Sequence, residues 1–292
     1  MMKMSKIINY VFIISLLLTL SGCIGNNKKN CISVSILPVK YFVDRLTDES
    51  VKVNVMLPSG ADHDSYSPTP MQLKELSDSR LYIKIGYLGY ELSWDNRFEE
   101  LNKEMKVLNL SDNIDLIHNE DIVHGNHSHE GGIDPHIWMS PKIMRNLVPQ
   151  IKDAIIASFP ELKEKVEKNY AILKEDLEKL DIEYTQMTEV IKNRKFMIFH
   201  PALTYLARDY GFEQISIEFE GKEPSIARLA EIVERSKNED IKVIFIQAEY
   251  DKRNAELIAK ETDASLIDIN PMAYDWLSSM NDIRNMILLY LK

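Results

Sequence analysis

The sequence is poor in cysteine: its 292 residues contain only Cys23 and Cys31. Cys23 lies at the end of an apolar N-terminal segment, so Cys31 is the one cysteine left for the folded part of the chain. A single thiol can build neither a disulfide framework nor a cysteine-based zinc site. We expect Cys31 to be a buried apolar residue at the start of a strand.

The sequence has fewer basic than acidic residues, 35 against 45, and its formal net charge is −10. Loss of residues 1–22, which carry two lysines and no acid, would change it from −10 to −12. Nucleic-acid phosphates need a basic surface, so the charge argues against a nucleic-acid partner. It fits a protein that attracts cations, although plain solubility would explain the same charge.

No apolar run is long enough for a comfortable membrane span, which needs about 20 residues. The apolar run at 7–20 follows two lysines and ends in Leu-Ser-Gly-Cys, at Cys23. This order is typical of a secretory signal peptide, and its last four residues resemble the bacterial lipobox, in which Cys23 would carry the lipid. We therefore expect residues 1–22 to be a lipoprotein signal peptide and the protein to be extracytoplasmic, periplasmic or on the cell surface. An ordinary signal peptide with a chance cysteine is the alternative.

Short apolar runs alternate with amphipathic segments in both halves of the chain. The expected strands are 32–37, 51–57, 81–85 and 106–110, then 195–199, 215–219, 243–246 and 265–269. Alternation of this kind predicts α/β lobes with parallel sheets.

Between the two halves, apolar residues recur at spacings of three and four from Tyr170 to Ile191. This stripe predicts one long helix. A coiled coil is possible for such a length, but the position favours a rigid helix that joins two lobes. We expect an N-terminal lobe at 23–140, connecting helices at 141–194 and a C-terminal lobe at 195–292.

Five of the seven histidines lie between residues 118 and 136. They are His118, His124, His127, His129 and His136. Imidazole is the commonest metal ligand, and it suits zinc, copper, iron or nickel better than magnesium or calcium. Residues 118–130 could also be a polar surface loop without a ligand role. His136 differs, because apolar bulk surrounds it in Asp-Pro-His-Ile-Trp.

Other polar residues follow predicted strands. His200 comes directly after the strand at 195–199, Asp62-His63-Asp64 follow that at 51–57, and Asp268 and Asn270 end that at 265–269. Ligands of open α/β sheets bind beyond the carboxyl ends of the strands. These residues, with His136, predict a cleft between the lobes that could hold a metal through three or four ligands.

At these residues the chain resembles the zinc and manganese solute-binding proteins of bacterial ABC importers, the ZnuA/TroA type (cluster A-I). The similar segments are LPSGADHDSYSPTP (57–70), DPHIWMSP (134–141), FHPALTYLARDYGFEQISI (199–217) and INPMAYDW (269–276). The resemblance implies two α/β lobes on a long rigid helix, with metal held between them and delivered to a membrane permease. It also implies a His-rich loop before the second ligand in the zinc branch.

The resemblance assigns metal ligation to His136 and His200. The family's first ligand is a histidine, but counting back from Pro68-Thr69-Pro70 places that register on Asp64, with His63 one residue earlier. The register favours Asp64 slightly, and a one-residue slip would restore His63. At the fourth position Asn270 replaces the usual aspartate; an amide is a weak zinc ligand, so Asn270 could instead orient a ligand or a water, with Asp268 as a fallback. We expect three protein ligands and an open or water-filled position.

Zinc is the expected metal and manganese the alternative, since nitrogen-rich sites disfavour manganese. The loop histidines, His118, His124, His127 and His129, would collect zinc weakly and pass it inward. We expect a monomer that binds a permease, with a lipid anchor in the membrane.

Two other functions remain open from the sequence. A metal-binding adhesin of the same family would differ mainly in its partner. A zinc hydrolase would also use three ligands and an open position. However, the sequence has neither H-E-x-x-H nor G-x-S-x-G, and nothing places Glu220 or Glu249 on the metal. We therefore expect a binding protein and not an enzyme.

Overall fold

The structure is a computed structural model that describes residues 30–118, 132–218 and 224–292. The expected signal peptide, the lipidation residue Cys23 and the loop histidines His124, His127 and His129 lie outside these ranges. Within them, no helix has the length and apolar character needed to cross a bilayer.

The N-terminal lobe is a four-stranded parallel sheet with the strand order β2-β1-β3-β4. Its strands are β1 (Cys31–Val34), β2 (Lys52–Val55), β3 (Leu81–Lys84) and β4 (Lys106–Asn109). Helices α2 (Leu37–Thr47), α3 (Pro70–Ser77) and α4 (Gly89–Leu101) connect them. Cys31 is buried at the start of β1, as expected.

The C-terminal lobe repeats this plan with the order β6-β5-β7-β8, again all parallel. Its strands are β5 (Lys195–Ile198), β6 (Glu213–Ser216), β7 (Val243–Gln247) and β8 (Ser265–Ile269). Helices α7 (Thr204–Tyr210), α8 (Ile226–Asn238), α9 (Arg253–Thr262) and α10 (Trp276–Leu291) complete the lobe. In both sheets the second strand pairs with one side of the first strand, and the third strand pairs with its other side. This reversal makes the switch point at which ligands of α/β sheets bind.

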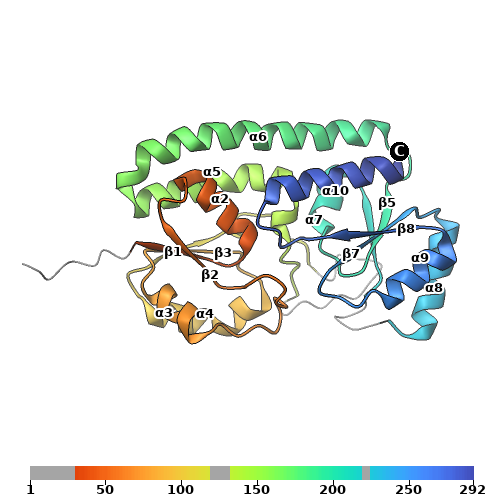
Figure 1. Ribbon diagram of the computed structural model, residues 1–292, viewed down its shortest axis with the longest axis horizontal. Helices are drawn as coiled ribbons and strands as arrows, with labels where there is room; N and C mark the ends of the chain where they lie inside the picture. Colours follow the sequence, from red (N-terminus) through yellow and green to blue (C-terminus); the bar gives the residue numbers. More distant parts are fainter. Residues whose placement is uncertain (1–29, 119–131, 219–223) are drawn as a thin grey trace, which may run out of the picture.

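Two long helices join the lobes. The 3-10 turns η2 (Ile137–Met139) and η3 (Pro160–Leu162) flank α5 (Pro141–Ser158), and α6 (Lys163–Val190) follows. Figure 1 shows α6 running along both lobes, with α5 and α10 beside it. The long connecting helix and the two parallel-sheet lobes predicted from the sequence are confirmed.

Local sequence explains where several helices begin. Thr69, Ser140 and Ser225 each accept a hydrogen bond from the backbone N–H three residues later. A proline follows Thr69 and Ser140, where the missing N–H costs nothing. One strand was misplaced by sequence reasoning: β6 begins at Glu213 and not at Ile215. Its first two residues, Glu213 and Gln214, are polar and only half-buried, so no apolar run marks the start of this strand.

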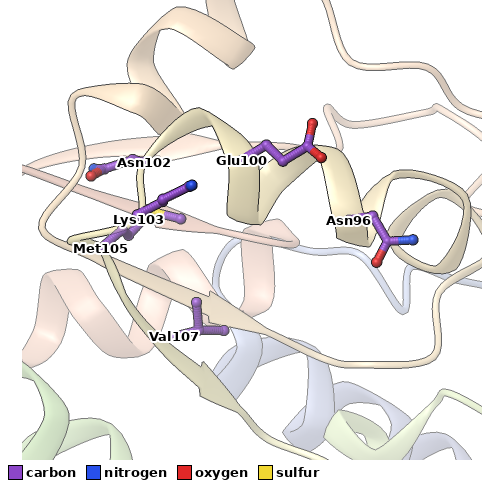
Figure 2. Close-up of a pocket in the computed structure, with 6 residues that line it drawn as sticks. All are labelled: Asn96, Glu100, Asn102, Lys103, Met105 and Val107. Atoms are coloured by element: carbon purple, nitrogen blue, oxygen red, sulfur yellow. The ribbon is translucent and has the colours of Figure 1, made fainter.

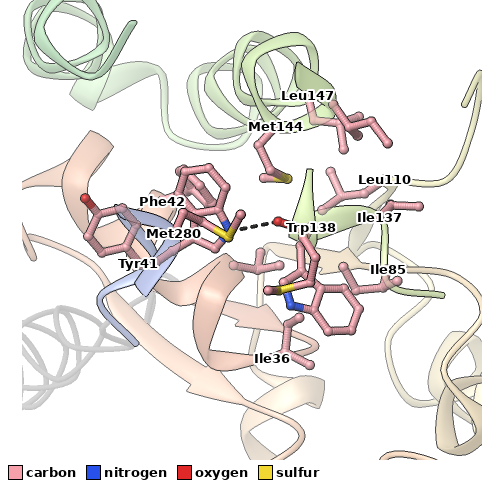
Figure 3. Packing of buried hydrophobic residues seen from close by; sticks show 14 of the residues in the cluster. Ile36, Tyr41, Phe42, Ile85, Leu110, Ile137, Trp138, Met144, Leu147 and Met280 are labelled. Carbon is pink, nitrogen blue, oxygen red and sulfur yellow. Dashed lines mark hydrogen bonds between the residues drawn. The ribbon is translucent and has the colours of Figure 1, made fainter. Parts of the chain in front are cut away.

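One apolar core contains residues of both lobes, from Ile32 to Leu291, and a second, smaller core lies within the C-terminal lobe. In the core that contains residues of both lobes, Trp138 of η2 lies near Ile36 and Ile85 (Figure 3). The Trp138 indole N–H donates to the carbonyl of Pro271 at 2.9 Å. The Trp276 indole donates in turn to the carbonyl of Trp138 at 2.7 Å. The lobes are therefore held together by buried packing as well as by the connecting helices.

Candidate metal centre

Three histidines from both lobes meet between the sheets. His63 lies in the loop after β2, His136 immediately before η2, and His200 two residues after β5. The ring centroids of the three pairs are 5.2 to 5.5 Å apart. Each ring offers one ligand nitrogen, and these three nitrogens all lie within 4.8 Å of one another. The structure thus brings together the three predicted histidines at one point.

A carboxylate holds the Nδ1 atom of each ring. Asp64 Oδ1 lies 3.0 Å from His63 Nδ1, and Asp134 Oδ1 lies 2.9 Å from His136 Nδ1. Glu218 Oε2 lies 3.0 Å from His200 Nδ1. These contacts fix the ring orientations and make Nε2 the atom that each imidazole can offer to a metal. A carboxylate on the far nitrogen also raises the basicity of the ligand nitrogen.

The site is buried: the residues His63, His136 and His200 are only 8%, 2% and 6% exposed. Tyr250 stacks on the ring of His200, with centroids 5.2 Å apart and planes 13° from parallel. The Trp138 ring packs against His136 at 5.1 Å. Apolar and aromatic neighbours of this kind limit solvent access to the three rings.

The pKa values of His136 and His63 are shifted in opposite directions. Burial lowers the pKa of His136 below its usual value, against the opposing effect of Asp134, so its imidazole is neutral at pH 7. Burial also lowers the pKa of His63, but the hydrogen bond and charge of Asp64 outweigh it, and the pKa is raised overall. Neutral imidazole is the form that binds a metal. His136 is therefore ready to bind, whereas metal binding at His63 competes with a proton.

The loop that carries the first histidine places His63, not Asp64, in the cluster. Asp64 is exposed, and together with exposed Asp62 and buried His63 it forms a second group of possible ligand atoms that shares His63 with the cluster. The register slightly favours Asp64, whereas in the structure the side chain that lies with His136 and His200 is that of His63. Asp64 supports His63 from outside.

Asp268 and Asn270 lie elsewhere. Asp268 is exposed and forms an ion pair with Lys252, 2.5 Å between Nζ and Oδ1. Asn270 Oδ1 accepts the backbone N–H of Met272 at 3.0 Å. Both residues line a cavity of about 530 Å³ that extends to α10 and contains none of the three histidines. Another cavity, of about 750 Å³, lies between the end of α4 and β4 and is likewise separate from the cluster (Figure 2).

Sequence reasoning missed Glu218. This residue is 5% exposed and follows β6, which pairs directly with β5, the strand that leads to His200. The available signal was an acid directly after the apolar run at the end of β6. Of the loop histidines, only His118 falls within the described residues; it is exposed and bridges to Ile133.

Comparison with known proteins agrees with the fold. A family model described as "ZnuA: Zinc-uptake complex component A periplasmic" matches residues 32–286. The chain belongs to the ZnuA family. A crystal structure of ZnuA superposes with a TM-score of 0.80 at 30% identity, covering 90% of this chain and 99% of that one.

Two curated relatives of this ZnuA-family chain carry zinc in their names. The zinc-binding lipoprotein AdcA of Streptococcus pneumoniae (strain ATCC BAA-255 / R6) is 28% identical over 85% of this chain and 51% of its own length. The high-affinity zinc uptake system protein ZnuA of Bacillus subtilis (strain 168) is 27% identical over 80% of this chain and 76% of its own. The chain thus spans about half the length of AdcA.

Proposed function

We propose that this protein captures a zinc ion between its two lobes outside the cytoplasm and delivers it to the permease of an ABC importer. The observation that carries the proposal is the convergence of three buried histidines from both lobes, each held at Nδ1 by a carboxylate. Membership in the ZnuA family and the names of the relatives support transport as the purpose of binding.

The ligand chemistry favours zinc. Zinc binds imidazole nitrogen at about 2.0–2.1 Å, in sites of four ligands. Three nitrogens leave one position, which a water or an oxygen of the loop around His63 would fill. Manganese prefers oxygen ligands, and the cluster of three ligand atoms contains none. We therefore assign zinc ahead of manganese and place His63, His136 and His200 as the ligands.

The carboxylates suit a receptor better than a hydrolase. Zinc hydrolases of the H-E-x-x-H type use a free glutamate as general base for the reaction. Here Asp64, Asp134 and Glu218 each engage a ligand imidazole. Their negative charge would also attract a divalent cation. We infer a binding protein, monomeric, with Cys23 as a lipid anchor to a bacterial membrane.

Metal titration of the chain without residues 1–23 tests the binding function. We expect one tightly bound zinc ion per chain, preferred over manganese, and its loss in His136→Ala. Competition with a chromophoric chelator, with metal content by mass spectrometry, measures both. Preferential manganese binding, or zinc that survives His136→Ala, would contradict the proposal. In cells at limiting zinc, zinc uptake that does not depend on a permease would favour an adhesin over a transport receptor.

Replacing Glu218 with glutamine is expected to weaken zinc binding about 10- to 100-fold, because the amide keeps the size but loses the charge that raises the basicity of His200. The matched control is Glu249→Gln, which alters an exposed acid outside the cluster and should change the affinity little. Chelator competition on both variants checks the prediction. Equal affinities for the two variants would show that Glu218 does not act on the metal through His200.

A further inference from the structure

The first turn of α4 lies against the backbone that carries His63. The backbone N–H of Tyr90 donates to the carbonyl of His63 at 3.1 Å. A Cβ atom added to Gly89 would lie 2.7 Å from Asp64 Cα and 2.8 Å from Asp64 O. Real Cβ atoms essentially never approach other atoms so closely, so a side chain at position 89 would force this contact apart.

The backbone conformation of Gly89 does not itself call for glycine. Its φ lies outside the left-handed range, unlike that of Gly60 or Gly86. Alanine is a better helix former than glycine, so at an open position it would favour the helix. The contact with Asp64 is therefore the feature that requires glycine at this position.

The start of α4 is firmly held. The buried Glu91 carboxylate accepts hydrogen bonds from the backbone N–H groups of Ile85, Gly86 and Leu88. It also accepts the hydroxyl of Ser35. These contacts tie the helix to the ends of β1 and β3, at the switch point of the sheet.

The loop that carries His63 is more exposed than the start of α4, where Leu88, Tyr90 and Glu91 are buried. Asp62 and Asp64 are exposed, and bonds within the loop join Asp62 to the N–H of Asp64 and to the hydroxyl of Ser65. A clash at position 89 would consequently displace the loop and leave the helix in place. The ring of His63 would move with its backbone.

Building on the proposed zinc site, we infer that Gly89 is a positioning residue for the first zinc ligand, with Glu91 as the anchor of the turn to which it belongs. The close approach of Gly89 to Asp64, together with the Tyr90–His63 hydrogen bond, sets the place of the His63 ring relative to His136 and His200. A loop displacement of one ångström would remove one ligand from the shared point while leaving the other two.

The test is Gly89→Ala in the full-length chain and in a His63→Ala background. We expect Gly89→Ala to lower the zinc affinity about 10- to 100-fold, the range for changes to groups that orient a ligand. In the His63→Ala background it should change the affinity less than about twofold, because the ligand through which it acts is gone. The control, Ser59→Ala, changes an exposed side chain of the same loop at a residue whose φ is not positive, and it should have the smaller effect.

The His63→Ala background separates an effect on the position of His63 from a general loss of folding. A folding defect would weaken binding equally with and without His63, and that result, or an unchanged affinity of Gly89→Ala, would overturn the inference. If Gly89→Ala does not fold, Glu91→Gln loosens the same turn without a clash and should weaken binding several-fold only where His63 is present. Failure of the proposed function is separate: zinc binding by the parent protein would then not depend on His136.

Discussion

Replacing His200 with alanine is expected to lower the zinc affinity of the protein about 100- to 1000-fold. Structural zinc sites with four ligands bind with about 10–16 kcal/mol, so one imidazole accounts for roughly 3–4 kcal/mol. Each 1.4 kcal/mol corresponds to about a factor of ten in the dissociation constant.

The matched control for this prediction is His118→Ala. His118 is exposed at the base of the His-rich segment and does not belong to the three-histidine cluster. Its removal should change the equilibrium affinity of the tight site less than about threefold, since an exposed imidazole outside the cluster adds no ligand there. Competition with a chelator of known affinity measures both variants. Similar losses for His118→Ala and His200→Ala would place the tight site in the His-rich segment.

The second large effect is on stability: Trp276→Ala is expected to lower the free energy of unfolding by about 3–5 kcal/mol, as for other large-to-small changes in a core. Trp276 is 1% exposed and packs against Phe42 of the other lobe, with ring centroids 5.0 Å apart. Its indole N–H also satisfies the buried carbonyl of Trp138. Trp276→Phe keeps most of the volume but loses that hydrogen bond, so we expect a smaller loss of about 1–3 kcal/mol.

Trp94→Ala provides the comparison for Trp276. Trp94 is partly exposed and stacks on Phe98 at the edge of the N-terminal lobe, so its removal should cost less than half as much. Denaturant unfolding of the zinc-free variants measures the differences through the transition midpoints. Equal midpoints for Trp94→Ala and Trp276→Ala would show that the contact between the lobes adds nothing to stability.

The sequence by itself determined most of the local structure. Apolar runs marked the strands, and the stripe from Tyr170 to Ile191 marked the long helix, because burial of one face is written directly into residue spacing. His136 and His200 were also identifiable, since one lies among apolar neighbours and the other directly follows a strand. Their environment is set by residues close in the chain.

The tertiary structure alone decided which strand-end residues meet. Asp268 lies within β8 and Asn270 directly follows it, and β7 separates β8 from β5, so this strand ends away from His200. Glu218 follows β6, which is the direct neighbour of β5, and so it reaches His200. Strand order is set by long-range packing, and residue spacing along one strand does not contain it.

Tertiary contacts also decide which of the two side chains, His63 or Asp64, lies with His136 and His200. Counting residues could not separate two neighbours in a loop, because the direction of each side chain depends on what holds the backbone. Here the first turn of α4 holds it: Gly89 allows the close approach, and Tyr90 bonds the carbonyl of His63. In the structure His63 lies with His136 and His200, whereas Asp64 is exposed and bonds Nδ1 of the His63 ring.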